Sequence, residues 1–336
     1  MFSIWAFRSV AEHTNSWDNI TKYFSFSAII ILLVALSLTQ DNFLGTSNLK
    51  NLLRDTAPLM IMSAGMTMVL LFGSIDLSMG AVCSVSNVTY IHLMLAFQDS
   101  FSNPLLTSLA AMAVSLAFGL ASGLALGIIH VKLKVPSFIA SLGFMSLWQS
   151  VALLITQNPE SVPKALWGTV EWYKIAFGVV GLPLIVAIAI ILFIHCVTRY
   201  TPSGRTIFAI GGNERTARVA GMGVDRTKIL VFAINGVLAA LAGIFLAANL
   251  RSSAPTIGDP FTLKIVAACA LGGTSLAGGK GSELGTILGV FTVAIIENGM
   301  NFIGVNAYYQ NIVFGIFVLA AIALTVDRSI RGQIVK

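Results

Sequence analysis

Long apolar runs separated by short polar breaks dominate the sequence. A helix needs roughly 20 apolar residues to cross a bilayer, and most of these runs approach that length. The pattern predicts about ten membrane-spanning helices, at residues 24–40, 57–73, 77–97, 104–130, 136–156, 176–198, 228–250, 262–277, 284–304 and 307–326. Polar and glycine breaks around 57–97, and the shortness of 262–277, indicate broken or re-entrant helices there.

The composition supports a membrane protein. Hydrophobic residues make up 56% of the chain and charged residues 10%, whereas soluble domains have about 25% charged residues. Too few polar side chains remain to cover a water-facing surface. This excludes a soluble enzyme, a nucleic-acid-binding protein and a disordered chain. The predicted fold class is an all-α polytopic membrane protein surrounded by the lipid bilayer, with no nucleic-acid partner.

The basic residues predict the orientation. With the N-terminus inside, fourteen of the 20 lysines and arginines fall on inside segments, so we expect both termini to be cytoplasmic. Residues 1–23 are mixed in character and predict a cytoplasmic tail rather than a signal peptide. A transmembrane domain at 24–327 and a cytoplasmic tail at 328–336 follow. The longest outside loop, 157–175, carries Trp167, Trp172 and Tyr173, which suit the membrane interface.

Glycines recur at helical spacing in two of the predicted spans. Gly119, Gly123 and Gly127 lie in one span, and Gly285 and Gly289 lie in another. Small residues four apart allow helix backbones to approach closely, so we interpret both sets as packing sites. The glycine-rich segment 272–282 lacks the Walker A pattern, because Gly281 follows Lys280. It predicts a glycine hinge rather than a nucleotide site.

Polar residues inside the spans are few. Glu297 and the adjacent Asn298 lie within a span, with no basic partner expected inside the membrane. Such a carboxyl either faces a transport pathway or locks helix packing. Asp76 and Ser78 either cap the next helix or belong to a broken helix that lines the pathway. Asn87 is a further candidate pathway residue. The four histidines have no partner nearby in sequence, and we expect no catalytic pair and no metal site.

The longest inside loop, 199–227, contains a short charged helix flanked by glycines. Glu214 and Arg218 are spaced i, i+4, with the Glu in the favourable N-terminal position. Such a helix outside the membrane is a natural docking surface for another protein, although an ordinary solvated loop fits the pattern as well. The candidate docking residues are Gly212, Asn213, Glu214, Arg215, Arg218 and Gly221.

Five segments occur in a characteristic order. They are GMTMVLLFGSIDLSMG, VPSFIASLG, GRTIFAIGGNERTARVAGM, LGGTSLAGGKGS and GVNAYYQNIVFG. Together, over about residues 45–327, they resemble the membrane permease subunit of ribose/galactose-type monosaccharide ABC importers, a family that also includes autoinducer-2 permeases. Related sequences often have a neutral polar residue where Glu297 stands.

The resemblance implies the partners and the mechanism. It implies a cytoplasmic ABC ATPase, an extracytoplasmic sugar-binding protein, and a second permease copy that is identical or paralogous. The segment from Gly212 to Met222 would carry the coupling helix that seats in the ATPase. ATP and Mg²⁺ would bind the partner ATPase, so this chain would need no cofactor and would not be an enzyme. The bacterial cytoplasmic membrane is the expected location.

Four alternatives remain open at this point. An ion-coupled secondary carrier would use Glu297. A non-transporting membrane scaffold or receptor would show no substrate flux. Within the ABC class, a permease for branched-chain amino acids or one for nucleosides would share most of these features.

Overall fold

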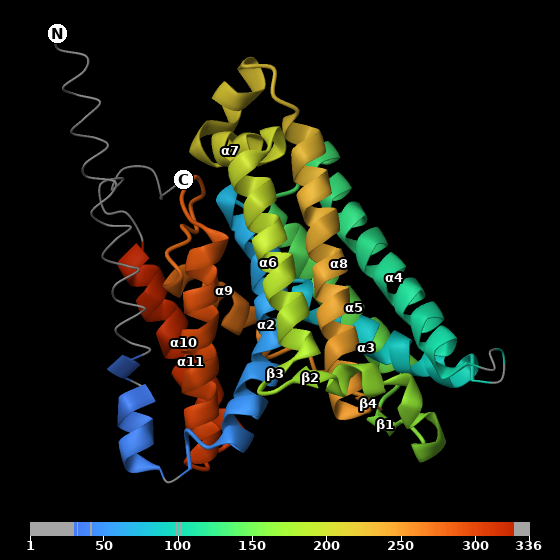
Figure 1. Ribbon diagram of the computed structural model, residues 1–336. Helices are drawn as coiled ribbons and strands as arrows, with labels where there is room; N and C mark the ends of the chain where they lie inside the picture. Colours follow the sequence, from blue (N-terminus) through green and yellow to red (C-terminus); the bar gives the residue numbers. More distant parts are fainter. Residues whose placement is uncertain (1–29, 32, 41, 99, 101–102, 326–336) are drawn as a thin grey trace.

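The computed structural model describes residues 30, 31, 33–40, 42–98, 100 and 103–325, and helices dominate this part of the chain (Figure 1). Residues 30, 31 and 33–39 are helical. The longer helices are α2 (Thr46–Leu71), α3 (Met79–Ala96), α4 (Pro104–Lys132), α5 (Ser137–Ile155), α6 (Leu182–Tyr200), α7 (Pro202–Val219), α8 (Val224–Leu250), α9 (Phe261–Leu271), α10 (Glu283–Phe302) and α11 (Ala307–Thr325). The predicted tails 1–23 and 328–336 lie outside the described residues, and the domain boundaries stay predictions.

The helix starts follow local sequence signals. Asn103 accepts a hydrogen bond from the backbone N–H of Leu105 at 2.9 Å, and Pro104 begins α4. Thr201 and Ser282 accept hydrogen bonds in the same way at the starts of α7 and α10. Each cap satisfies a backbone donor that the helix itself leaves without a partner.

Close glycine contacts hold α4 against α8, as the sequence predicts. A Cβ atom added to Gly119 would collide with the backbone of Gly236, and one added to Gly123 would collide with the carbonyl of Phe232. On the other side of the molecule, Gly285 meets Gly272 and Gly289 meets the carbonyl of Ala268. The second set joins α10 to α9, so both glycine repeats are packing sites.

The two suspected breaks are present. Helix α2 ends at Leu71 and α3 begins at Met79. Helix α9 has only 11 residues, and the glycine-rich segment 272–282 continues from it without helix or strand. This segment returns to α2, where the Gly279 N–H donates to the carbonyl of Leu71 at 2.8 Å. The glycine hinge therefore packs against the end of α2.

The segment between α5 and α6 differs from the prediction. Residues 176–181 were expected to begin a span, but β2 (Ala176–Phe177) and β3 (Val180–Gly181) pair as a hairpin and α6 begins only at Leu182. Leu182 is followed by Pro183, a residue that favours the first turn of a helix.

The rest of this segment folds onto the helices. Two 3₁₀ helices, η1 (Lys164–Thr169) and η2 (Glu171–Lys174), follow β1 (Glu160–Ser161), which pairs with β4 (Ser252–Ser253). Tyr173 is buried, and Trp172 contacts Phe245 of α8. These two aromatic side chains therefore pack on α8 as well as suiting an interface.

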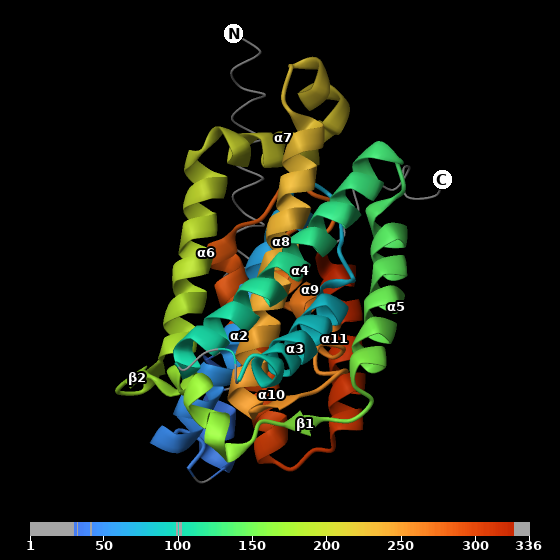
Figure 2. The ribbon, with the colours of Figure 1, turned by 90° about the vertical axis from the view of Figure 1, so that its right-hand side faces the viewer.

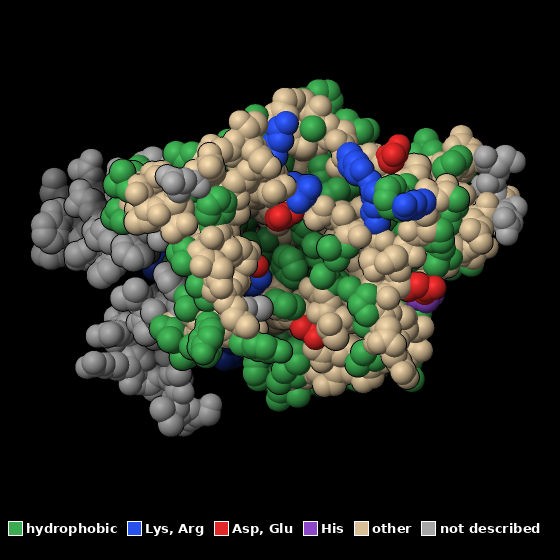
Figure 3. Space-filling view, turned by 90° about the horizontal axis from the view of Figure 1, so that it is seen from below, with side chains coloured by type: hydrophobic (Ala, Val, Ile, Leu, Met, Phe, Trp, Pro, Cys, Tyr) green, Lys and Arg blue, Asp and Glu red, His purple; other side chains and the backbone are tan. Residues whose placement is uncertain are grey.

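The helices form one bundle with two distinct ends. Helix α7 lies at one end, and the short strands lie at the opposite end (Figures 1 and 2). Six of the described helices are long and apolar enough to cross a membrane, namely α3, α4, α5, α6, α8 and α10. The strand end is hollowed near its middle, where acidic and basic side chains gather (Figure 3).

Candidate coupling helix and buried polar residues

Helix α7 is bent at Asn213, which has extended backbone angles inside the helix. The Asn213 side chain accepts a hydrogen bond from the N–H of Thr216 at 3.0 Å. This is the geometry of an N-cap, so Asn213 starts a second short helix. That helix begins at Glu214, as the sequence predicts, and Gly221 follows it with a left-handed φ of 76°. Glycine adopts this turn without strain.

An ion-pair network anchors the short helix to α8. Arg218 lies 3.1 Å from Glu214, which is the predicted i, i+4 pair, and 2.8 Å from Asp225. Lys228 of α8 lies 2.7 Å from the second Glu214 oxygen. Partial burial raises the pKa of the Glu214 carboxyl, but the hydrogen bond and charge of Lys228, and then those of Arg218, lower it overall. The network fixes the helix on the end of α8.

The candidate docking residues differ in how far they are already engaged within the chain, and their docking role stays a prediction. Glu214 and Arg218 face their own chain, whereas Arg215 is exposed and has no ion pair among the described residues. Val219 is 84% exposed and Met222 is 38% exposed. Gly212 borders open space. The exposed surface of the short helix therefore carries Arg215 and part of Arg218, which is 54% exposed although paired, beside apolar side chains.

The middle of α7, at Gly211, contacts the glycine-rich segment 272–282. A Cβ atom on Gly211 would collide with the Leu71 carbonyl and with the Gly279 nitrogen. Gly73, Gly278 and Gly279 all have positive φ angles, which make this close approach possible. Helix α7 is therefore in direct contact with the end of α2.

Asp76 holds the turn that precedes α3 inside the bundle. Its Oδ1 accepts hydrogen bonds from the Ser78 N–H at 2.9 Å and from the Ser78 hydroxyl at 2.6 Å. Its Oδ2 accepts from Asn235 Nδ2 of α8 at 2.8 Å. Asp76 is only 3% exposed. Ser78 is the N-cap residue of α3 and forms no side-chain cap hydrogen bond, so the capping interpretation is wrong, and Asp76 instead holds the turn before α3. Asn235 is a partner that the sequence reasoning missed.

Asn87 is also buried and fully engaged. Its amide donates to the Gly243 carbonyl at 3.3 Å, and its oxygen accepts from the Ala254 N–H at 2.8 Å. It thus joins α3 to α8 and to the segment after β4. A pathway role for Asp76, Ser78 and Asn87 stays a prediction, since all three are buried by the protein itself.

Glu297 has a basic partner, contrary to the expectation. Lys264 Nζ of α9 lies 2.5 Å from Glu297 Oε1, with the two side chains 9% and 33% exposed. The rings of Phe261 and Phe314 lie 5.4 Å from the same ammonium group. The predicted span 262–277 already contains Lys264, and the prediction was wrong because the sequence does not show that this helix packs beside Glu297. The neighbouring Asn298 forms a reciprocal amide pair with Asn48 of α2 at 3.0 Å.

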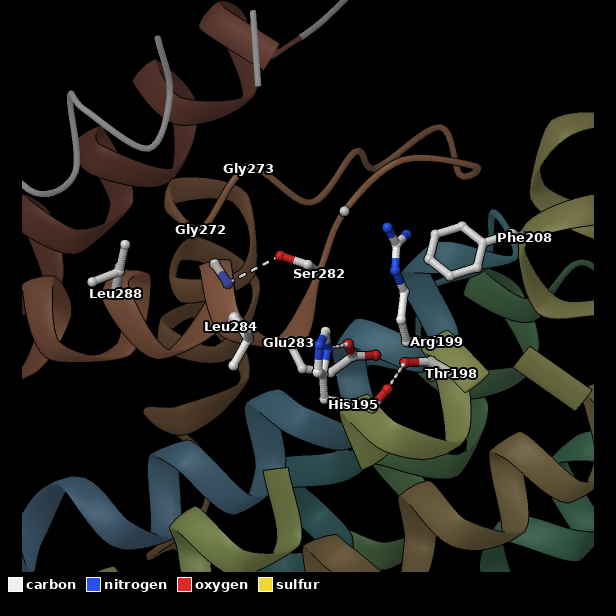
Figure 4. Close-up of a pocket in the computed structure, with 12 residues that line it drawn as sticks. His195, Thr198, Arg199, Phe208, Gly272, Gly273, Ser282, Glu283, Leu284 and Leu288 are labelled. Atoms are coloured by element: carbon white, nitrogen blue, oxygen red, sulfur yellow. Dashed lines mark hydrogen bonds and ion pairs between the residues drawn. The ribbon is translucent and has the colours of Figure 1, made fainter. Parts of the chain in front are cut away.

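Histidine partners come from distant helices. His195 Nδ1 of α6 lies 3.0 Å from Glu283 Oε2 at the start of α10, and His92 lies 3.3 Å from Glu160. Neither pair is near in sequence, so residue spacing does not predict either pair. His195 and Glu283 border a cavity of about 540 Å³ between α6, the middle of α7 and the start of α10 (Figure 4).

The whole span of helices matches a known family. Residues 48–322, from the start of α2 into α11, match the family described as "Branched-chain amino acid transport system / permease component". The chain belongs to this permease family. The permease is 36% identical to the ribose import permease protein RbsC of Bacillus subtilis (strain 168), over 90% of this chain and 92% of the relative.

Two further relatives agree. The permease is 36% identical to RbsC of Escherichia coli (strain K12), over 92% of this chain and 94% of the relative. It is 31% identical to the D-allose transport system permease protein AlsC of the same strain, over 92% of this chain and 91% of the relative. The chain is therefore a multi-pass transporter component of the inner membrane rather than an enzyme, and the resemblance stated from the sequence is confirmed.

Proposed function

We propose that this permease translocates a monosaccharide or a related small polyol as the membrane subunit of an ATP-driven importer. Its relatives are named for ribose and D-allose transport, and they cover nearly the whole chain. The observation that carries the proposal is the short helix Glu214–Val219, which is capped, anchored to α8, and exposed at the end of the bundle.

The proposed assembly contains two permeases, two cytoplasmic ATPase subunits and an extracytoplasmic sugar-binding protein. Both termini and α7 face the cytoplasm, and the strand end faces the binding protein. ATP and Mg²⁺ bind the ATPase, so this chain holds no cofactor. Residues 24–327 form the transmembrane domain between two cytoplasmic tails.

The proposed mechanism is alternating access. Closure of the ATPases on ATP moves the short helix, and the network of Glu214, Arg218 and Lys228 carries this movement to α8. The contact of Gly211 with Gly279 and Leu71 carries it to the end of α2. Rigid helices with two packing arrangements suit such a transmission. The hollow at the strand end (Figure 3) supports substrate entry from that side.

An ion-coupled carrier loses its main support. That alternative depends on a carboxyl without a partner in the membrane, whereas Glu297 is paired with Lys264. In the conformation described, the ammonium group of Lys264 neutralises the Glu297 carboxylate, so no transported cation is needed to neutralise it. No other described observation favours the alternative.

Uptake in the native host tests the proposal. The gene that encodes this permease is deleted. Uptake of radiolabelled ribose, allose, xylose, leucine and uridine by the deletion strain is then compared with uptake by a complemented strain. We expect loss of uptake of one or more sugars. The restored uptake should cease when arsenate depletes ATP and should persist when an uncoupler collapses the proton gradient.

Three results would contradict the proposal. Uptake that follows a proton or sodium gradient in ATP-depleted cells would indicate a secondary carrier. Loss of leucine or uridine uptake alone would assign another substrate class. Unchanged uptake of all five compounds in the deletion strain would show that this permease is not required to transport any of them.

A further inference from the structure

A cavity of about 540 Å³ lies between the end of α6, the start of α10 and the segment 272–282. Phe208 of α7 closes one side of it (Figure 4). Sites for small ligands commonly have volumes of about 300–1,000 Å³, so the cavity is large enough for a small polar group. Neither the capping of α10 nor the coupling contacts described above explain this space.

The cavity is bordered by a buried carboxylate that lacks one partner and by an exposed cation. Glu283 is 1% exposed, and its Oε2 is paired with His195, but its Oε1 has no hydrogen-bond partner among the described residues. Figure 4 shows this second oxygen pointing away from the imidazole ring. Arg199 also borders the cavity and forms no ion pair with any described carboxylate. A buried acceptor without a partner requires a donor.

An apolar groove lies next to the polar cavity along α10. It has a volume of about 300 Å³ and is lined only by apolar side chains, from Leu33, from three leucines of α2, and from Leu288, Phe291 and Ile295 of α10. Leu288 lines both spaces. The spacing from 288 to 291 and 295 places the three α10 side chains on one helix face. The polar cavity and the apolar groove therefore border the same residue of α10.

The position along α6 matches the edge of a membrane. Leu192 and Phe193 are 44% and 69% exposed, as expected for side chains that face lipid in this protein. Arg199 comes about two helical turns later, near the end of α6 at Tyr200. A basic side chain just beyond exposed apolar residues lies at the level of lipid headgroups.

We propose that the cavity and groove together bind one phospholipid with a primary-amine headgroup. Its phosphate lies beside Arg199, and its ammonium group donates a hydrogen bond to Glu283 Oε1. One acyl chain follows the groove past Leu288 and Phe291 to Ile295. This site is separate from the sugar pathway and stands whether or not the proposed substrate is correct.

The headgroup chemistry follows from the two unsatisfied groups. A purely anionic headgroup pairs with Arg199 but leaves Glu283 without a donor. A choline headgroup carries a cation but has no N–H to donate. A free amine phosphate satisfies both polar groups but leaves the apolar groove empty. A phospholipid with a primary amine satisfies all three features.

Native mass spectrometry of the purified full-length chain tests the site. The delipidated protein in detergent is titrated with phosphatidylethanolamine, phosphatidylcholine and phosphatidylglycerol of the same acyl chains. We expect phosphatidylethanolamine to bind most tightly. The Arg199→Gln variant should weaken it about tenfold, which is the effect of losing one charge-assisted hydrogen bond. Leu288→Trp, which fills the junction of the two spaces, should abolish it.

Two further variants separate the site from general lipid adhesion. Arg205→Gln removes an exposed cation of α7 and should leave binding unchanged. Glu283→Gln should reduce the preference for phosphatidylethanolamine over phosphatidylglycerol. If Glu283→Gln fails to fold, the headgroup ranking of the wild-type protein decides this point.

Several outcomes would overturn the proposal. Equal binding of the three lipids, or equal weakening by Arg199→Gln and Arg205→Gln, would show nonspecific adhesion. Binding of free phosphoethanolamine as tight as that of the lipid would assign a soluble ligand. Binding that appears only after deletion of residues 1–23 would assign the groove to the chain's own N-terminal segment.

Discussion

Gly279 donates its backbone N–H to the carbonyl of Leu71 at 2.8 Å, and the middle of α7 rests against this bond. Gly211 approaches both residues so closely that a side chain does not fit. Five residues beyond Leu71, the buried Asp76 accepts a hydrogen bond from Asn235 of α8. The contact of α7 with the glycine-rich segment thus lies next to the break between α2 and α3.

The first prediction concerns Gly211 and its neighbour. A Gly211→Ala substitution should lower the free energy of unfolding by about 1–3 kcal/mol, the usual cost of overpacking, and should reduce uptake. The Cβ atom would collide with backbone atoms of Leu71 and Gly279, which cannot rotate away. Thermal unfolding in detergent and uptake in cells measure the two effects.

Gly212→Ala is the matched control. A Cβ atom at Gly212 meets no atom within 4 Å, so this variant should be as stable as the wild type and transport normally. If both substitutions had the same effect, the contact between α7 and the glycine-rich segment would have no special role.

The second prediction concerns Lys264 and Glu297. Lys264→Met should destabilise the protein, because it leaves a carboxyl without its partner. Breaking a buried pair costs about 3–5 kcal/mol, and we expect on the order of 1–3 kcal/mol here, since the Glu297 side chain is 33% exposed. The double variant Lys264→Met with Glu297→Gln should recover most of the lost stability.

Uptake distinguishes packing from a pathway role. If the pair only locks α9 against α10, the double variant should transport at nearly the normal rate and with an unchanged pH profile. A stable double variant without transport would show that the charges act on the substrate or its path. The thermal unfolding temperature of each variant shows whether a loss of uptake results from a loss of stability.

The third prediction concerns orientation. Cysteines introduced at Ser203, in α7, and at Ser161, in β1, should react differently with a membrane-impermeant maleimide in intact cells. Both positions are exposed, and they lie at opposite ends of the bundle (Figure 1). Ser161→Cys should react and Ser203→Cys should be protected. A Cys196→Ser background is needed because Cys196 is exposed. Labelling of Ser203→Cys from outside would reverse the orientation.

The sequence predicted most of the fold because membrane helices are specified by local patterns. Apolar runs predicted the helices, and glycines at every fourth position predicted where α4 meets α8. The i, i+4 spacing of Glu214 and Arg218 predicted their ion pair. The start of α6 was misplaced because residues 176–181 are apolar, and periodicity cannot distinguish a short exposed hairpin from the beginning of a span.

Pairs that join distant helices could not be predicted in the same way. Lys264 and Glu297 are 33 residues apart, and His195 and Glu283 are 88 residues apart. Their contact depends on which helices pack together, and one sequence does not show this. A signal was nevertheless present, because a lysine or glutamate within an apolar helix needs a partner. Asn235, within the apolar sequence of α8, gave the same signal.

The last prediction concerns the docking face of the short helix. Reversing the charge of Arg218 is a poor test, because a glutamate there would lie beside Glu214 and Asp225 and disrupt the network that holds the helix on α8.

Arg215 and Val219 face outward instead, without partners among the described residues. Arg215→Glu and Val219→Asp should therefore leave thermal stability unchanged, since exposed substitutions usually alter it by less than about 0.5 kcal/mol. Both should abolish co-purification of the ATPase and sugar uptake, because a mismatched charge at an interface costs several kcal/mol. Arg205→Glu, on the first part of α7, is the control and should retain both. If Arg215→Glu and Val219→Asp retained ATPase binding and normal uptake, the ATPase would have to dock elsewhere on the permease.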